Sequence, residues 1–280
     1  MVKNFYQKEL LISATQQQNG PQVRKDILKI QSWLVLYEMR HPGSATLTSI
    51  DGDFGPATDQ AVKNFQKLNH LPVNGVVDEK VFSKLSDPLK QSFETPPTGR
   101  NLREMVVNTA IIHLSQHPVE LMINKETNSG PWVRSYMDGH EGDAWFWCMG
   151  FVQAIIDQAT SAFNKSYKTL MPPTYSCDTV GSFALTQHNL VSSAKLRHNP
   201  ALIKPGDIFL IQKSPFDWIH TGIVVKAGTE TIESIEGNTN SMGSRNGNAV
   251  FRRVRNFMKT KMDGVEVCVQ FIAVVMAMPI

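Results

Sequence analysis

The chain has 280 residues, of which 41% are hydrophobic and 19% are charged. This composition excludes wholesale disorder, and the length predicts two domains at about 150 residues each. The formal net charge of +3 is too small to predict nucleic-acid binding, although it would not oppose a polyanionic surface. No apolar run approaches the roughly 20 residues of a membrane-spanning helix, so we expect no membrane insertion.

The N-terminal sequence MVKNFYQKELLISATQQQNG has no basic segment followed by an apolar run and a cleavage site. We therefore expect synthesis in the cytoplasm without a signal peptide, and another route outward if the protein acts outside. The three cysteines, Cys148, Cys177 and Cys268, are an odd number and predict no disulfide framework.

The first part of the chain predicts three helices. The stretches VRKDILKIQSWLVLYEM, TDQAVKNFQKLNH and DEKVFSKL carry apolar residues at helical spacing. DGDFGP precedes the second helix and NG precedes the third, so two turn-helix stretches loosely echo each other. SDPLKQSFETPPTGRN then has three prolines and no periodicity, which predicts a linker. We place domain boundaries at residues 1–88, 89–102 (the linker) and 103–280.

Within residues 21–88, DGDFGPATDQAVKNFQKLNHLPVNGVVDEKVFSKL resembles the three-helix peptidoglycan-binding domain attached to bacterial wall hydrolases. The connection YEMRHPGSATLTSI is longer than is usual in that family. The resemblance implies peptidoglycan as the binding partner. The alternative for the individual motif residues is that they only form the turns and caps of a small helical domain.

The second part begins with two predicted helices, NLREMVVNTAIIHLSQ and GDAWFWCMGFVQAIIDQAT. Short β-branched stretches separated by Gly, Asp or Asn follow, and they predict strands. These are DIFLIQ, IHTGIVVK, TIESIE, AVFRRVR and VEVCVQFIAVV. Helices followed by an antiparallel run of strands indicate an α+β domain.

Cys148 stands where a loop becomes a helix, and a helix start favours thiolate. A small buried hydrophobe is the alternative. His220 begins a predicted strand, and Glu236 and Asn238 end the next one, where either could orient the imidazole. A Cys-His pair oriented by a third group is the pattern of a nucleophile and its base. Spacing alone does not choose between Glu236 and Asn238, and we favour Glu236.

WCMGFV, KPGDIFLI with DWIHTGIVV, ESIEGNTN and GSRNGNAVFRRVR together resemble the CHAP class of cysteine amidases and peptidases, relatives of the NlpC-type wall peptidases. The resemblance covers residues 103–280 and implies a papain-like fold with a helix-borne cysteine on an antiparallel sheet. It also implies amide hydrolysis through a thioester, with Cys148 as nucleophile, His220 as acid and base, Glu236 as orienter and Asn238 as a supporting group. Trp147 replaces the glutamine of many members, which leaves backbone N–H groups as oxyanion donors.

We expect four residues to line the rim for a peptide stem: Asn128, Trp132, Trp147 and Trp218. Cys177 could stand near the active site or be buried. Three arginines of one predicted strand look like its solvated edge, with an anionic glycan as the alternative partner: Arg252, Arg253 and Arg255.

We expect no cofactor and no metal. His113 and His117 have the spacing of two ligands on one helix face but no third ligand. Calcium at the acidic loop DGHEGD, residues 138–143, is the alternative.

Together the two resemblances imply a peptidoglycan hydrolase that cuts an amide bond, either between muramic acid and the stem peptide or within that peptide. We expect it to be a monomer. We expect action in the periplasm or cell wall, as a phage endolysin or as a secreted antibacterial effector with an immunity protein as partner. The alternatives are a non-catalytic wall-binding protein and a cysteine transpeptidase or acyltransferase.

Overall fold

The computed structural model describes residues 1–244 and 246–266, so Cys268 and most of the last predicted strand lie outside the described residues. The chain forms two compact units. The helical unit consists of Asn4–Glu94 and Val119–Trp145, and the sheet unit consists of Met1–Lys3, Thr95–Pro118 and the described residues from Phe146 onward. No helix among the described residues is long and apolar enough to cross a membrane.

The helical unit contains the three predicted helices, and that prediction is confirmed. They are α2 (Arg24–Arg40), α3 (Pro56–Leu68) and α4 (Glu79–Leu85), preceded by the short α1 (Tyr6–Glu9). Pro56 occupies the first turn of α3, where its missing N–H costs nothing, and Asp78 caps α4 by accepting from the Val81 N–H. The apolar stripes meet in a core that includes Ile27, Ile30, Leu34, Val62, Phe65 and Phe82.

Two buried glutamines hold the two turns that echo each other in the sequence. Gln31 of α2 accepts from the backbone N–H groups of Asp51 and Gly52 at 3.1 and 2.8 Å. Gln66 of α3 accepts from those of Asn74 and Gly75, each at 3.0 Å. Each turn therefore wraps around a side-chain amide of the preceding helix, so these motif residues maintain the shape of the domain.

The linker prediction for residues 89–102 is wrong in its first part. Helix α5 (Asp87–Glu94) occupies it, and Leu89 and Phe93 are buried. Pro88 does not prevent the helix because proline is tolerated in a first helical turn. Residues 95–101 contain no helix or strand, and α6 (Leu102–Ser115) begins after the cap at Asn101.

The predicted boundary at residue 103 also differs from the structure, because residues 119–145 belong to the helical unit. This segment carries β1 (Leu121–Ile123), β2 (Glu126–Ser129) and α7 (Pro131–Tyr136). Trp132 packs edge-on against Trp33 with ring centroids 5.9 Å apart. Arg134 joins Glu9 and Glu141 at 2.7 and 2.8 Å. Aromatic burial and an ion pair therefore hold α7 to a part of the chain far away in sequence.

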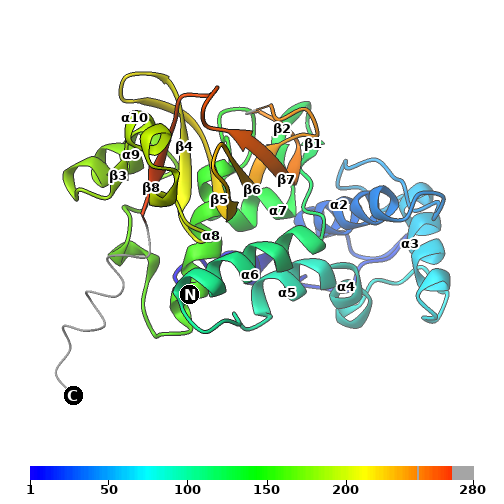
Figure 1. The fold of residues 1–280 in the computed structure, drawn as a ribbon. Coiled ribbons are helices and arrows are strands. Elements are labelled where there is room, and N and C mark those ends of the chain that lie inside the picture. The colour runs from blue at the N-terminus through cyan, green and yellow to red at the C-terminus, as the bar shows by residue number, and fades with distance from the viewer. Residues whose placement is uncertain (245, 267–280) are drawn as a thin grey trace. The chain divides into compact units, whose positions relative to one another are not determined.

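The sheet unit contains a six-stranded sheet in the order β3-β8-β4-β5-β6-β7, with every neighbouring pair antiparallel. Its long strands appear side by side in Figure 1. The strands are β3 (Leu190–Val191), β4 (Ile208–Ser214), β5 (Asp217–Ala227), β6 (Thr231–Thr239), β7 (Ala249–Asn256) and β8 (Met262–Val265). One core cluster of this unit includes Leu196, Phe209, Val224, Ile232, Phe257 and Met262.

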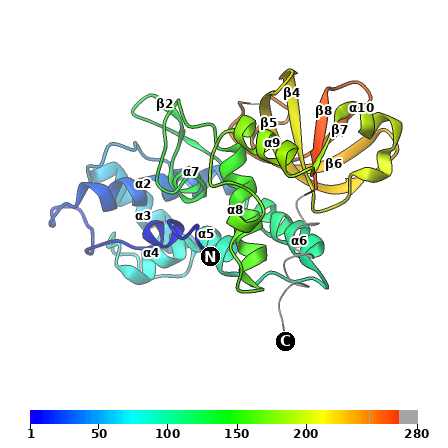
Figure 2. The same cartoon turned by 90° about the vertical axis from the view of Figure 1, so that its left-hand side faces the viewer.

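Helix α8 (Cys148–Ser161) packs against β5, β6 and α6, and α9 (Cys177–Thr186) packs against β5 (Figure 2). The remaining helical elements are α10 (Ser193–His198) and the 3₁₀ turns η1 (Tyr167–Thr169) and η2 (Pro200–Leu202). Gly237 of β6 permits a close approach, because a Cβ there would lie 2.7 Å from the Cβ of Phe151 and 2.9 Å from the Trp147 ring. The expected α+β arrangement, with a cysteine-bearing helix packed on an antiparallel sheet, is confirmed.

Candidate active site

Cys148 is the first residue of α8, as the sequence predicts, and its side chain is buried. Helix starts leave backbone N–H groups without intrahelical partners, and these groups favour a negative charge. The N–H of Met149 contributes in this way to the low pKa of the Cys148 thiol. The same N–H groups are suited to stabilise an oxyanion formed beside the sulfur.

His220 of β5 and Glu236 of β6 form a buried pair. His220 Nε2 and Glu236 Oε2 are 2.8 Å apart, and both side chains are fully inaccessible. Nδ1, the other ring nitrogen, has no hydrogen-bond partner among the described residues, and the Cys148 thiol is close enough to His220 to contribute to the raised pKa of the ring. The structure therefore brings Cys148, His220 and Glu236 together, with Glu236 in the orienting position.

The charges of these three groups support one another. Burial alone would lower the pKa of His220, but its interactions with Cys148 and Glu236 outweigh burial and raise it to about 9. Burial would raise the pKa of Glu236, but hydrogen bonds from Arg255 and His220 lower it to about 2. A hydrogen bond from Cys177 and the interactions with His220 hold the pKa of Cys148 well below that of an ordinary thiol. A thiolate and an imidazolium are therefore the favoured resting forms.

Two further side chains hold the Glu236 carboxylate. Ser234 donates its hydroxyl to Oε1, and Arg255 of β7 donates Nε to Oε1 at 2.9 Å and Nη2 to Oε2. The expectation that Arg255 belongs to a solvated edge is wrong, because this side chain is 15% exposed and turned to a buried acid. Arg252 does fit that expectation, since its exposed side chain meets Glu233.

Gly222 makes room for this arrangement on β5. A Cβ at this position would lie 2.6 Å from Glu236 Cγ, 2.9 Å from Phe209 and 3.0 Å from the Ile235 carbonyl. A side chain there would displace Glu236 from His220. The space that Gly222 leaves is therefore filled by the Glu236 side chain.

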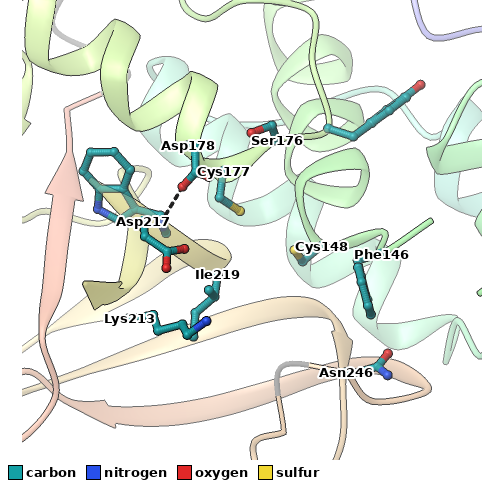
Figure 3. A pocket seen from close by; sticks show the side chains of 11 residues that line it. Phe146, Cys148, Ser176, Cys177, Asp178, Lys213, Asp217, Ile219 and Asn246 are labelled. Atoms are coloured by element: carbon teal, nitrogen blue, oxygen red, sulfur yellow. Dashed lines mark hydrogen bonds between the residues drawn. The ribbon is translucent and has the colours of Figure 1, made fainter. Parts of the chain in front are cut away.

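Cys177, the first residue of α9, is buried next to Cys148, and both cysteines are free. Its thiol is hydrogen-bonded to Cys148, and this bond together with burial raises the pKa of Cys177 well above its ordinary value. The raised pKa favours a protonated Cys177, which is then placed to donate to the Cys148 sulfur. Figure 3 shows the two sulfur atoms directed toward one another from the two helices.

Replacing this donor should make Cys148 less reactive. Because a hydrogen bond to a charged group contributes about 1.5–3 kcal/mol, we expect Cys177→Ala to slow iodoacetamide alkylation of Cys148 about tenfold or more in mildly acidic solution. Peptide mapping by mass spectrometry assigns the labelled cysteine. Cys177→Ser should restore most of the rate, and Ser176→Ala, which removes the α9 cap at the pocket wall but keeps the Cys177 thiol, should not lower it. Equal rates for Cys177→Ala and wild type would contradict this role.

A pocket of about 500 Å³ opens over the two thiols (Figure 3). Lys213, Asp217 and Trp218 line it from the sheet, and Asp178 lines it beside Cys177. Phe146 and Asn246 lie across from them. Cys148 thus lies at a cleft with charged groups on one side and an aromatic ring on the other.

The structure separates the four predicted rim residues. Trp218 lines the pocket, donates its indole N–H to Asp263 and its backbone N–H to Asp178. The other three predictions are wrong, because these side chains are 0–1% exposed: Trp147, Asn128 and Trp132. Trp147 packs near Gly237, whereas Asn128 and Trp132 belong to the helical unit. A sequence does not distinguish an aromatic residue at a rim from one in a core.

Asn238 is buried and donates its amide to the Gly247 carbonyl at 3.1 Å, in a backbone conformation with φ of 53°. It therefore supports the loop after β6. No local pattern indicates the pocket residues Phe146, Lys213 and Asp217, because they surround Cys148 only after the strands and helices assemble. A signal for Arg255 was present, since a basic residue on the strand beside a buried acid is a natural partner for it.

The acidic loop at residues 138–143 uses its carboxylates within the protein. Glu141 accepts from the Gly130 N–H and from Arg134, and Asp143 accepts from the Thr127 N–H and hydroxyl. His113 is hydrogen-bonded to Gln158. In residues 1–244 and 246–266, no group of three or more His, Cys, Asp or Glu side chains could hold a metal ion.

Comparison with known families identifies the helical unit's main segment. Residues 23–85 match the family described as "Putative peptidoglycan binding domain". The predicted wall-binding domain is therefore confirmed, and the match supports association with the cell wall and peptidoglycan as a partner. Neither the curated proteins nor the solved structures contain a significant match to the chain.

Proposed function

We propose that the protein is a peptidoglycan hydrolase that cuts an amide bond through a cysteine thioester. The observation that carries this proposal is the buried chain of contacts from Cys148 through His220 to Glu236, which opens at a pocket in a protein with a peptidoglycan-binding domain. The proposed fold of the sheet unit is papain-like, because a cysteine-bearing helix packs on an antiparallel sheet that carries the histidine. Binding to a repetitive polymer would raise the local concentration of scissile bonds.

In the proposed reaction, the Cys148 thiolate attacks the amide carbonyl carbon, and the oxygen takes the negative charge beside the α8 N-terminus. His220 then gives its proton to the leaving nitrogen, the C–N bond breaks and a thioester remains. His220 next takes a proton from water, whose oxygen attacks the thioester carbon. The carboxylic acid leaves and the thiolate–imidazolium pair is restored. Glu236 holds the ring through Nε2, which leaves Nδ1 as the nitrogen that would exchange the proton in this reaction.

The bond that is cut lies either between muramic acid and the stem peptide or within the stem peptide. The cell wall is the proposed site of action, with release as an endolysin or delivery as an antibacterial effector as the two routes. The function itself is tested first because both routes depend on it.

The test is digestion of purified peptidoglycan by wild type and Cys148→Ala, with mass analysis of the soluble products. We expect wild type to release fragments and Cys148→Ala to release none, because the variant has no nucleophile. Free stem peptides would identify an amidase, and truncated muropeptides an endopeptidase. Thermal unfolding and co-sedimentation with insoluble walls provide the control, since Cys148→Ala should fold and bind as wild type does.

Two results would overturn the proposal. If wild type binds walls but releases no more than Cys148→Ala, the protein is a wall-binding module without hydrolytic activity. If products accumulate only with an added amine and carry that amine, the thioester is used for transfer.

A further inference from the structure

We propose that Arg255 is a positioning residue that locks Glu236 against His220 and supplies the positive charge that keeps Cys148 a thiolate. This inference rests on the proposed function, because it extends the Cys148, His220 and Glu236 chain by one residue. Arg255 does not line the pocket. It would act on the reacting sulfur only through Glu236 and His220.

Arg255 is fixed in place by hydrogen bonds from three of its nitrogen atoms. Its Nε and Nη2 atoms donate to the two oxygens of the same carboxylate, and Nη1 donates to the Gly243 carbonyl at 3.3 Å. Such a fork fixes the plane of the carboxylate as well as its charge. Glu236 Oε2 then faces both Arg255 and His220 Nε2. The imidazole is therefore oriented by a carboxylate that is itself held from the other side.

The charges explain why a second cation is required. Cys148 as thiolate and Glu236 as carboxylate bring two negative charges into a buried site, and His220 as imidazolium brings one positive charge. Arg255 supplies the second positive charge, so the four groups are neutral together. Without it, the excess negative charge would favour uptake of a proton by the site, because burial penalises an unbalanced charge. The thiolate would be protonated at a higher pH than in wild type.

Other titratable groups face Cys148, His220 and Glu236 from the elements packed around them. Cys177 from α9 faces Cys148, with Asp178 next to it, and the Ser234 hydroxyl from β6 faces Glu236. Among the described residues that make these contacts, Cys177 is a neutral donor and Asp178 is acidic, so neither of them supplies positive charge. Lys213 and Asp217, one basic and one acidic, also line the pocket over Cys148, and Arg255 from β7 is the cation bonded directly to Glu236.

The test measures the rate of Cys148 alkylation by iodoacetamide against pH, with peptide mapping to assign the label. The variants are Arg255→Met, Arg255→Gln and Arg255→Lys. The control is Arg252→Met, because Arg252 is on the same strand but pairs with Glu233 at the exposed surface. We expect Arg255→Met and Arg255→Gln to move the acid-side inflection up by about one pH unit, since they remove one nearby charge. Arg255→Lys should bring the inflection most of the way back to its wild-type pH, and Arg252→Met should have the wild-type inflection.

The neutral variant that folds decides the result, so Arg255→Gln replaces Arg255→Met if the latter does not fold. If both neutral variants fail to fold, Arg255→Lys decides the result, because it keeps the positive charge but cannot form the two-point contact with Glu236. A changed His220 ¹⁵N shift with a nearly wild-type inflection would support the proposal, and a wild-type His220 ¹⁵N shift would overturn it. A neutral Arg255 variant with the wild-type inflection also overturns it.

This readout needs no wall substrate, so the two proposals can fail separately. If wild-type Cys148 alkylates with the pH dependence of an ordinary thiol, the thiolate–imidazolium pair is absent and the proposed function fails. If wild type has a low inflection that Arg255→Gln leaves in place, only the role of Arg255 fails. If the inflection shifts but walls are not digested, the role of Arg255 stands and hydrolysis fails.

Discussion

Glu236→Gln is expected to lower the rate of wall digestion by about 100-fold or more, because general acid and base catalysis by His220 depends on its orientation and charge. Glutamine has nearly the shape of glutamate but no negative charge. It cannot balance the imidazolium, and it leaves the buried Arg255 guanidinium facing a neutral amide. Both effects weaken the thiolate–imidazolium pair.

The loss of the Glu236 charge should also change how the rate of wall digestion depends on pH, in a direction that the pKa of His220 predicts. In wild type, contact with Cys148 and Glu236 overcomes burial and raises the pKa of His220 to about 9. On the alkaline side, the rate of wall digestion should therefore stay high until the pH approaches that value. Above it, His220 has lost the proton that the leaving nitrogen requires. Without the Glu236 charge the pKa of His220 is lower, so the alkaline limb should move to lower pH in Glu236→Gln.

Glu233→Gln is the matched control, because Glu233 lies on the same strand but forms surface pairs with Lys226 and Arg252. It should retain the wild-type rate and pH profile. Initial rates of soluble fragment release, measured from pH 5 to 10, compare the three proteins. If both glutamine variants keep the wild-type profile, Glu236 does not support His220 in the reaction.

Arg134→Met should destabilise the helical unit by about 3–5 kcal/mol, since removing one partner of a buried ion pair leaves the other charge uncompensated. The guanidinium donates to both oxygens of Glu9, whose side chain is 3% exposed, and also to Glu141. These contacts outweigh the burial penalty and raise the pKa of Arg134 above its already high ordinary value. Methionine fills much of the space but neutralises neither acid.

Denaturant unfolding followed by tryptophan fluorescence measures this loss, because Trp33 and Trp132 lie in the helical unit. Lys63→Met is the comparison within the same unit. Its partner is Asp59 one helical turn away and its side chain is 38% exposed, so the expected change is roughly 0.5 kcal/mol or less. Equal midpoints for Arg134→Met and Lys63→Met would contradict a structural role for the buried pair.

Local patterns predicted the elements whose apolar spacing is regular. The three predicted helices of the helical unit (α2, α3 and α4), α6, α8 and the strands β4 to β7 all lie where periodicity places them. The position of Cys148 at a helix start followed from the same reasoning, because the polar loop HEGDAWFW ends at the apolar helix. The spacing of apolar residues and the polar residues that bound a helix or strand are local properties, so one sequence is sufficient to recognise them.

Tertiary partners could not be predicted in the same way. Helix α5 was hidden because prolines on both sides of Leu89 and Phe93 suggest a linker, and its burial depends on neighbours such as Tyr6 and Tyr136. The roles of Cys177 and Arg255 depend on contacts between elements that are separate in the chain. The same applies to Asn128 and Trp132, whose burial in the helical unit was mistaken for a place at the rim.

The helical unit is built from two stretches of chain, and this has a consequence for how such a protein can evolve. The matched peptidoglycan-binding segment ends at residue 85, yet the unit also includes residues 119–145, with Trp132 against Trp33 and Arg134 against Glu9. A single recombination breakpoint directly after the matched segment would separate α7 from its partners Trp33 and Glu9. Exchange of the matched segment between proteins as one block is thus disfavoured. Changes in what the helical unit binds should accumulate as point substitutions instead.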